Sequence, residues 1–157
     1  MTPEELSQLR RRQWHLRAKP IRVAVSKVIA DAIGESPSSI VFTDLDETEQ
    51  IADLFSTQLR NSDEIELPNR EAAIDFVTRS LSGITGPSYL LVEEYHKCGM
   101  VVLDFAKAIE NLNSLLKCQY ECFRLISASG EAGVCITVEE GSASRYPRYI
   151  NLWRRMD

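Results

Sequence analysis

The feature that most constrains the fold is a change in hydrophobic periodicity near the middle of the chain. Before residue 83, apolar residues recur at the three- and four-residue spacing of amphipathic helices. From Ser88 onward, they form the short continuous or alternating runs that are typical of strands. The 157 residues are within the usual size of one domain. We therefore predict a single α+β domain, residues 1–157, in which a helical N-terminal half packs on a largely antiparallel sheet formed mainly by the C-terminal half.

The first residues predict a helix with a definite end. Thr2 supplies a hydroxyl N-cap and is followed by a proline and two acidic residues, which is the usual order at a helix start. Pro20 disfavours helical geometry at the residue before it, so we expect this first helix to end near Arg17. A second helix is expected from Ile21, because apolar residues recur along one face until Gly34, which suits a helix C-cap.

A short strand over residues 38–43 is expected to lead into two further helices. Asp46 is followed three residues later by Glu49, which matches a capping box. We therefore predict that Asp46 caps a third helix beginning at Glu47. The fourth helix is predicted over residues 69–81, where apolar residues again recur at helical spacing before two glycines.

The C-terminal half predicts two hairpins separated by a helix. Apolar residues from Phe105 to Leu116 share one helical face, so a continuous helix is expected there. Apolar or alternating runs flank this helix on both sides, with glycine-containing turns between them. The expected strands cover residues 89–92, 100–103, 121–127, 134–139 and, as an edge strand, 149–153.

Cysteine usage and hydropathy favour a cytoplasmic location. The chain opens with polar and acidic residues, without the pattern of a secretory signal, and its longest apolar runs are too short to span a membrane. Two zinc-like spacings occur, but the second is expected to be divided between a helix and a strand, so we predict no metal site. We expect all four cysteines to be reduced and free of metal: Cys98, Cys118, Cys122 and Cys135.

One motif points to catalysis. The apolar segment that ends at Asp44 and the D-x-D-x-T sequence that follows resemble the first motif of haloacid-dehalogenase-type phosphatases. The resemblance implies that Asp44 is the phosphoryl-accepting nucleophile, Asp46 the general acid and Mg²⁺ the cofactor. The family also needs a later hydroxyl residue followed by a lysine, and no lysine follows Ser127. A divergent magnesium-dependent phosphatase is therefore the alternative, and the helix cap is the preferred interpretation.

Other signatures of catalysis are missing from the sequence. It contains no nucleophile elbow, no phosphate-binding P-loop and no dinucleotide-binding glycine motif. Glu93, Glu94 and His96 form a polar cluster at the end of the first hairpin, where we expect them to be solvated. We therefore predict a protein that is not an enzyme, with no catalytic residue and no cofactor.

Charge is distributed unevenly along a chain whose net charge is −5. Residues 1–22 hold six basic against two acidic residues, and residues 145–157 hold four against one. We expect these basic ends to face solvent or to pair with acidic residues of the body. Binding of nucleic acid is not predicted, because a basic domain is the usual footprint of that function.

The segment from residue 44 to residue 66 has the opposite character, with eight acidic residues and one basic residue, Arg60. Small acidic α+β proteins of this kind resemble bacterial immunity proteins, which neutralise a cognate toxin, often a basic nuclease. The resemblance is carried by size, charge and architecture, and it implies a basic protein partner such as a toxin domain. A regulatory or scaffold domain is a further alternative.

We expect the basic partner to bind an exposed surface that lacks internal cationic partners other than Arg60. This surface, called the acidic set below, consists of Asp44, Asp46, Glu47, Glu49, Asp53, Asp63, Glu64 and Glu66.

Overall fold

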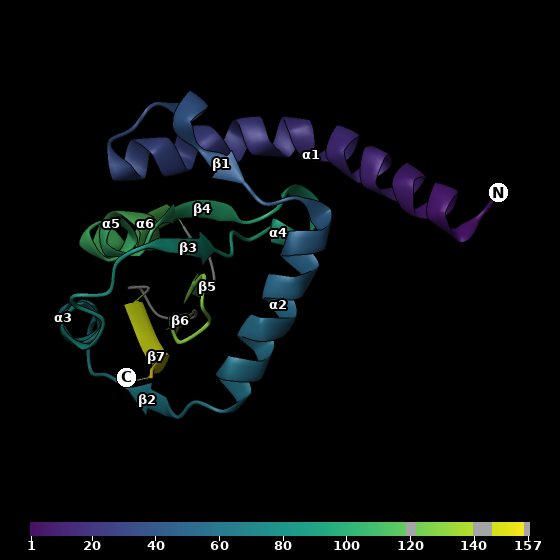
Figure 1. Cartoon of the computed structure of the whole chain (residues 1–157). Helices are drawn as coiled ribbons and strands as arrows, with labels where there is room; N and C mark the ends of the chain where they lie inside the picture. The colour runs from purple at the N-terminus through teal and green to yellow at the C-terminus, as the bar shows by residue number, and fades with distance from the viewer. Residues whose placement is uncertain (119–121, 140–145, 156–157) are drawn as a thin grey trace.

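A computed structural model of the chain describes residues 1–118, 122–139 and 146–155 (Figure 1). Within these ranges the helices are α1 (Pro3–Ile33), the 3₁₀ turn η1 (Pro37–Ser39), α2 (Leu45–Arg60), α3 (Arg70–Ser80), α4 (Tyr95–Cys98), α5 (Phe105–Glu110) and α6 (Leu112–Cys118). The strands are β1 (Val41–Phe42), β2 (Glu64–Glu66), β3 (Pro87–Leu90), β4 (Val101–Asp104), β5 (Cys122–Ser127), β6 (Ala132–Glu139) and β7 (Tyr146–Arg154). The predicted α+β class, with N-terminal helices and a C-terminal antiparallel sheet, is confirmed.

The described strands form one antiparallel sheet in the order β1-β4-β3-β5-β6-β7-β2. Both predicted hairpins are present, as β3 with β4 and β5 with β6, although residue 121 lies outside the described residues. The C-terminal strand is longer than predicted and is not an edge, because β2 pairs along its outer side. The acidic strand β2 was not predicted, since three residues with one apolar side chain are too few to show a strand pattern.

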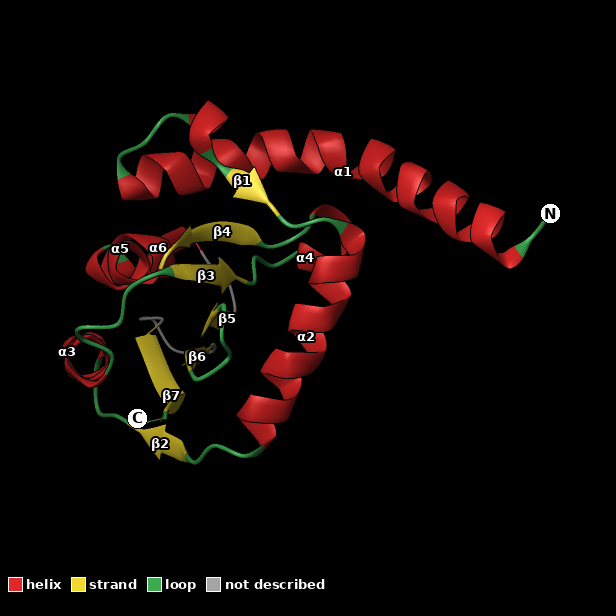
Figure 2. Ribbon diagram, viewed as in Figure 1, coloured by secondary structure: helices red, strands yellow, loops and turns green. Residues whose placement is uncertain are grey.

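The sheet separates two apolar cores. Strand side chains alternate between the two faces, so Leu125 joins the larger core with α1, α3, α5 and α6, while Ile126 joins the smaller core beneath α2. From α2, Ile51 and Phe55 fill this smaller core. Figure 2 shows α2 running alone along one side of the sheet, across from α3, α5 and α6. The acidic α2 is therefore held by a narrow apolar stripe, with its other faces in solvent.

The predicted break at Pro20 is wrong, because α1 is one continuous helix that contains this proline. Pro20 is exposed on the outer side of the helix. The backbone carbonyl that loses a hydrogen bond because proline has no N–H group is therefore not buried without a donor. Side chains on both sides of it hold the helix to the body: Trp14 Nε1 donates to the carbonyl of His96 at 2.9 Å, and Arg22 Nε donates to the carbonyl of Cys98 at 2.7 Å. Tertiary contacts here outweigh the local preference against helix before proline.

Two other boundaries differ from the prediction. Only the last part of the expected strand over residues 38–43 is extended, because Pro37 starts a 3₁₀ turn. The helix expected to run from Phe105 to Leu116 is divided at Asn111, whose side-chain amide donates to the carbonyl of Lys107 at 2.9 Å. A side chain that bonds to the backbone in this way competes with the helical hydrogen bonds.

A tight crossing between two loops fixes where α2 begins. The Thr43 N–H donates to the Met100 carbonyl at 2.9 Å, and the Met100 N–H donates to Thr43 Oγ1 at 2.9 Å. Gly99 lies against the backbone carbonyl of Thr43, with a φ of 94°, and a Cβ atom placed there would clash with the carbonyl oxygen. Only glycine allows this approach.

We predict that Gly99→Ala lowers the free energy of unfolding by about 3 kcal/mol, because backbone strain and a steric clash act together. Gly83→Ala is the matched control, since Gly83 also has a positive φ, of 83°, but has open space around its Cβ position. The control is expected to cost about 1 kcal/mol, measured by urea unfolding of both variants. Equal losses would contradict the clash.

Candidate partner-binding surface

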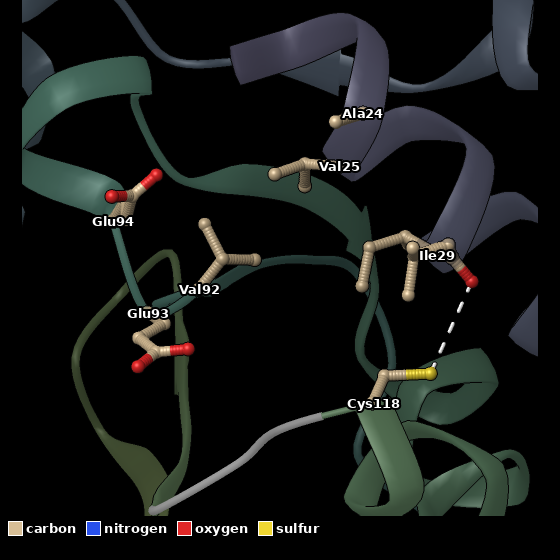
Figure 3. A pocket seen from close by; sticks show the side chains of 8 residues that line it. Ala24, Val25, Ile29, Val92, Glu93, Glu94 and Cys118 are labelled. Carbon is tan, nitrogen blue, oxygen red and sulfur yellow. Dashed lines mark hydrogen bonds between the residues drawn. The ribbon is translucent and has the colours of Figure 1, made fainter.

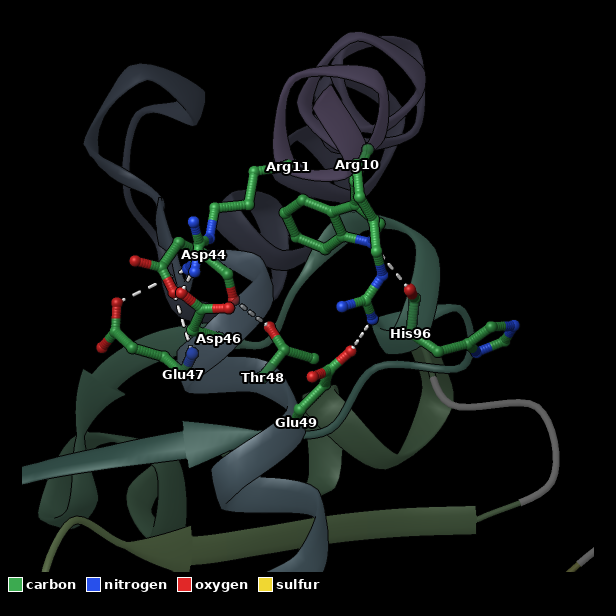
Figure 4. Close-up of polar contacts among 9 residues, drawn as sticks. Arg10, Arg11, Asp44, Asp46, Glu47, Thr48, Glu49 and His96 are labelled. Carbon is green, nitrogen blue, oxygen red and sulfur yellow. Dashed lines mark hydrogen bonds and ion pairs between the residues drawn. The ribbon is translucent and has the colours of Figure 1, made fainter. Parts of the chain in front are cut away.

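The N-terminal turn of α2 uses two members of the acidic set for its own stability. Asp44 is the N-cap, and its Oδ1 accepts the backbone N–H of Glu47 at 2.8 Å. Glu47 Oε1 in turn accepts the N–H of Asp44 at 3.5 Å, which completes a capping box (Figure 4). These two carboxylates also place negative charge at the positive end of the helix dipole.

The prediction that Asp46 is the cap is therefore wrong. Residues 44–47 and residues 46–49 both match the capping-box pattern, so local sequence alone does not choose between them. The tertiary structure selects the earlier start, because Thr43 is fixed by Met100 and Leu45 is buried as the first helical residue.

Two further members of the acidic set pair with the basic run of α1. Arg11 Nε donates to Asp46 Oδ2 at 3.0 Å, and Arg10 forms an ion pair with Glu49 (Figure 4). These two cationic partners come from α1 and not from the local sequence, in which Arg60 is the one basic residue. The pairing agrees with the expectation that the basic N-terminal end faces solvent or pairs with acidic residues of the body. Both pairs are largely exposed, so each contributes little to stability, but together they neutralise two of the four carboxylates of this turn.

The remaining exposed acidic residues lie farther along α2 and beyond it. Asp53, Asp63 and Glu64 are exposed, and their side chains form no ion pair among residues 1–118, 122–139 and 146–155. We call these three the distal group. Asp53 lies one helical turn beyond Glu49, whereas Asp63 and Glu64 follow the C-terminal end of α2, a helix of 16 residues that is about 24 Å long. The acidic set therefore extends along α2 and beyond it, and its ion pairs with α1 are confined to Asp46 and Glu49.

The distal group borders an open edge of the sheet. Glu64 and Glu66 are the ends of β2, which pairs with β7 on one side only and is the last strand in the order of the described strands. Ile65 between them is 38% exposed. This edge therefore presents backbone donors and acceptors between acidic side chains.

The phosphatase interpretation gains no support from this geometry. Asp44 is used as a helix cap, and Asp46 accepts a hydrogen bond from Arg11, where the family would need a lysine and a metal ion. Across the part of the chain that is described, no three His, Cys, Asp or Glu side chains come together as metal ligands. Both aspartates make contacts at the junction of α1 and α2.

The polar cluster at the end of the first hairpin is likewise used structurally. Glu94 pairs with Lys97 at 3.7 Å, and the carbonyl of His96 receives the hydrogen bond from Trp14. The side chains of Glu93 and His96 are exposed, as expected.

A cavity that the sequence did not indicate lies between α1 and the loop after β3 (Figure 3). It has a volume of about 280 Å³ and is lined mainly by apolar side chains, among them Val25, Ile29 and Val92. Glu93 and Glu94 line one side, and the thiol of Cys118 lies near the other (Figure 3).

All four cysteines are free of disulfide bonds, as predicted. Burial raises the pKa of Cys98 to about 11, against a weaker opposing effect of the nearby Arg22. The thiols of Cys122 and Cys135 are 3.3 Å apart on neighbouring strands. This contact, together with burial, raises the pKa of Cys135.

Comparisons with models of protein families, with curated proteins and with solved structures found no match. None of the described helices combines the length and apolar character needed to cross a membrane. The function is therefore inferred from the geometry and charge of the surface itself.

Substituting Asp44 and Asp46 one at a time distinguishes the stability contribution of the helix cap from that of the ion pair. Asp44→Ala is expected to lower the free energy of unfolding by about 1 kcal/mol, because the N-terminal amides of α2 lose their acceptor. Asp46→Ala is expected to cost less than about 0.5 kcal/mol, since it removes one exposed ion pair. Urea unfolding at low and high salt measures both, and a larger loss for Asp46→Ala would restore Asp46 as the cap.

The buried thiol of Cys98 gives a second test. At pH 8 almost none of a thiol with a pKa near 11 is ionised, so we expect iodoacetamide to leave Cys98 unlabelled in the native protein. Peptide mass mapping after labelling in urea is the control, because all four cysteines should then react. Rapid native labelling of Cys98 would contradict its burial.

Proposed function

We propose that this chain is a binding protein for a basic protein partner, and that it acts as an immunity-type inhibitor in the cytoplasm. The distal group carries the proposal, because Asp53, Asp63 and Glu64 are exposed and form no ion pair with any of the described residues. Charged residues that are left unpaired on a surface attract a partner of opposite sign and raise the rate of association.

The proposed contact differs from the surface expected from the sequence. Asp46 and Glu49 are occupied by α1, and Asp44 and Glu47 by the helix cap, so these four contribute less than the distal group. The open edge of β2 adds backbone groups that an extended basic segment of the partner can pair with. Specificity then comes from the acidic side chains on either side of Ile65.

Charge reversal at the distal group tests this proposal. The partner is first isolated with the wild-type chain by cross-linking and affinity capture, and is then produced separately for kinetic measurements. Asp53→Lys, Asp63→Lys and Glu64→Lys together are expected to slow association about tenfold or more at low salt, because the steering charge is reversed. The fold should be retained, since exposed substitutions usually change stability by less than about 0.5 kcal/mol each.

A matched control reverses three exposed charges elsewhere. Glu71→Lys, Glu110→Lys and Glu131→Lys change the net charge by the same amount but lie outside the acidic set. This variant is expected to slow association less than about threefold, an effect of net charge alone. Equal slowing of both variants, or an unchanged rate for the distal variant, would place the interface elsewhere.

A further inference from the structure

Helix α1 has a second apolar stripe that the body of the protein does not cover. Leu6, Leu9, Leu16 and Val23 are 54%, 38%, 65% and 57% exposed. They are four of the eight large apolar side chains that are exposed among the described residues. A row of exposed apolar side chains on one helix is costly in water unless a partner covers it.

The stripe faces away from the body. Leu16 and Ala18 are two positions apart, which is about 200° around the helix axis, and Ala18 is fully buried. Trp14 and Arg22 also bond to the body from the buried side. In Figure 1 the N-terminal part of α1 extends past the sheet and α2, so the stripe there is open to another molecule.

The spacing of the stripe is that of a coiled-coil seam. Successive members are separated by three, seven and seven residues, which places all four at the a and d positions of one heptad register. Gln13 and Pro20 occupy the intervening positions of the same register. Such a narrow seam suits one partner helix, whereas a helix that lies on a membrane needs a wider apolar face.

The positions beside the seam are basic. Arg12 and Lys19 lie along one side, and Arg10 and Arg17 along the other. Arg10 pairs with Glu49, while the side chains of Arg12, Arg17 and Lys19 form no ion pair with any described residue. The acid at a flanking position, Glu5, is engaged in the N-terminal capping box.

The basic residues beside the seam disfavour pairing of α1 with α1 of a second copy of the chain. Two such helices packed in parallel would bring Arg12 against Arg17, and an antiparallel pair would bring Arg12 against Lys19. Like charges at these positions are destabilising, so the seam selects a partner of opposite sign.

We propose that the outer stripe of α1 binds an amphipathic helix of a partner protein that has apolar residues at its seam and acidic residues beside it. This inference does not rest on the proposed function, because it concerns a different surface, with the opposite charge. It assigns the chain two docking surfaces, one for a basic and one for an acidic partner.

A designed peptide tests the proposal directly. The probe is a labelled helix of about four heptads with Leu at a and d and Glu at e and g, and the comparison peptide carries Lys at e and g. We expect wild-type protein to bind the acidic peptide at least about tenfold more tightly than the basic one, measured by fluorescence anisotropy. Equal affinity for the two peptides would overturn the proposal.

Two variants of the protein examine the seam and its flanks. Leu9→Gln with Leu16→Gln is expected to weaken binding of the acidic peptide about tenfold or more, because two seam contacts are lost. Val41→Thr with Ile65→Thr is the control, since these residues are 58% and 38% exposed on other elements and their replacement should leave the affinity unchanged. Arg12→Glu, Arg17→Glu and Lys19→Glu together are expected to reverse the preference to the basic peptide.

The same proteins also show whether the outer stripe of α1 binds a second copy of the chain or a membrane. Sedimentation equilibrium would reveal a wild-type dimer that Leu9→Gln with Leu16→Gln dissociates, and vesicles of phosphatidylglycerol and phosphatidylcholine would reveal membrane binding that this variant loses. Either result would overturn the proposal. Thermal unfolding followed by circular dichroism checks that each variant keeps its fold, because exposed substitutions should not change it.

Discussion

The arrangement of the N-terminal half depends on one half-buried cation, Arg22. Its guanidinium lies 5.4 Å from the ring centre of Trp14 and 5.2 Å from that of Phe42, and donates hydrogen bonds to two carbonyls, those of Cys98 and Thr43. One side chain therefore joins α1, the strand that leads into α2 and the C-terminal end of α4. Burial lowers the pKa of Arg22, while Cys98 and Asp44 act in the opposite direction. The planar guanidinium suits such a site because it stacks on rings and donates in several directions at once.

The charge pattern of the surface follows from this junction. Because Arg22 and Trp14 hold α1 across the start of α2, Arg10 and Arg11 meet Glu49 and Asp46, which reduces the negative charge of that region. Among the described residues, two groups of exposed charges without an ion pair carry the proposals: Arg12, Arg17 and Lys19 on the outer side of α1, and Asp53, Asp63 and Glu64 along and beyond α2. A chain with a modest net charge thus presents two surfaces of opposite sign, which is consistent with two partners.

Several parts of this structure could be predicted from the sequence because the signals are local. The helix over residues 69–81, the two hairpins and the α+β class depend on periodicity and turn residues that lie close together in the chain. The free cysteines and the exposure of most acidic residues follow from composition and from the lack of an apolar pattern around them. Strand β2 was missed because its pairing with β7 joins residues far apart in the chain.

The sequence by itself determined the α+β class, where the sheet lies in the chain and which segments carry charge, since each depends on side-chain type and spacing. Only the tertiary structure decided that α1 continues through Pro20, that Asp44 and not Asp46 caps α2, and which acidic residues stay unpaired. Each of these outcomes depends on contacts between residues distant in sequence, such as Thr43 with Met100 and Arg11 with Asp46. Local preferences of about 1 kcal/mol, or about 3 kcal/mol for a proline inside a helix, are outweighed when several such contacts act together, and these contacts leave no periodic pattern in the chain.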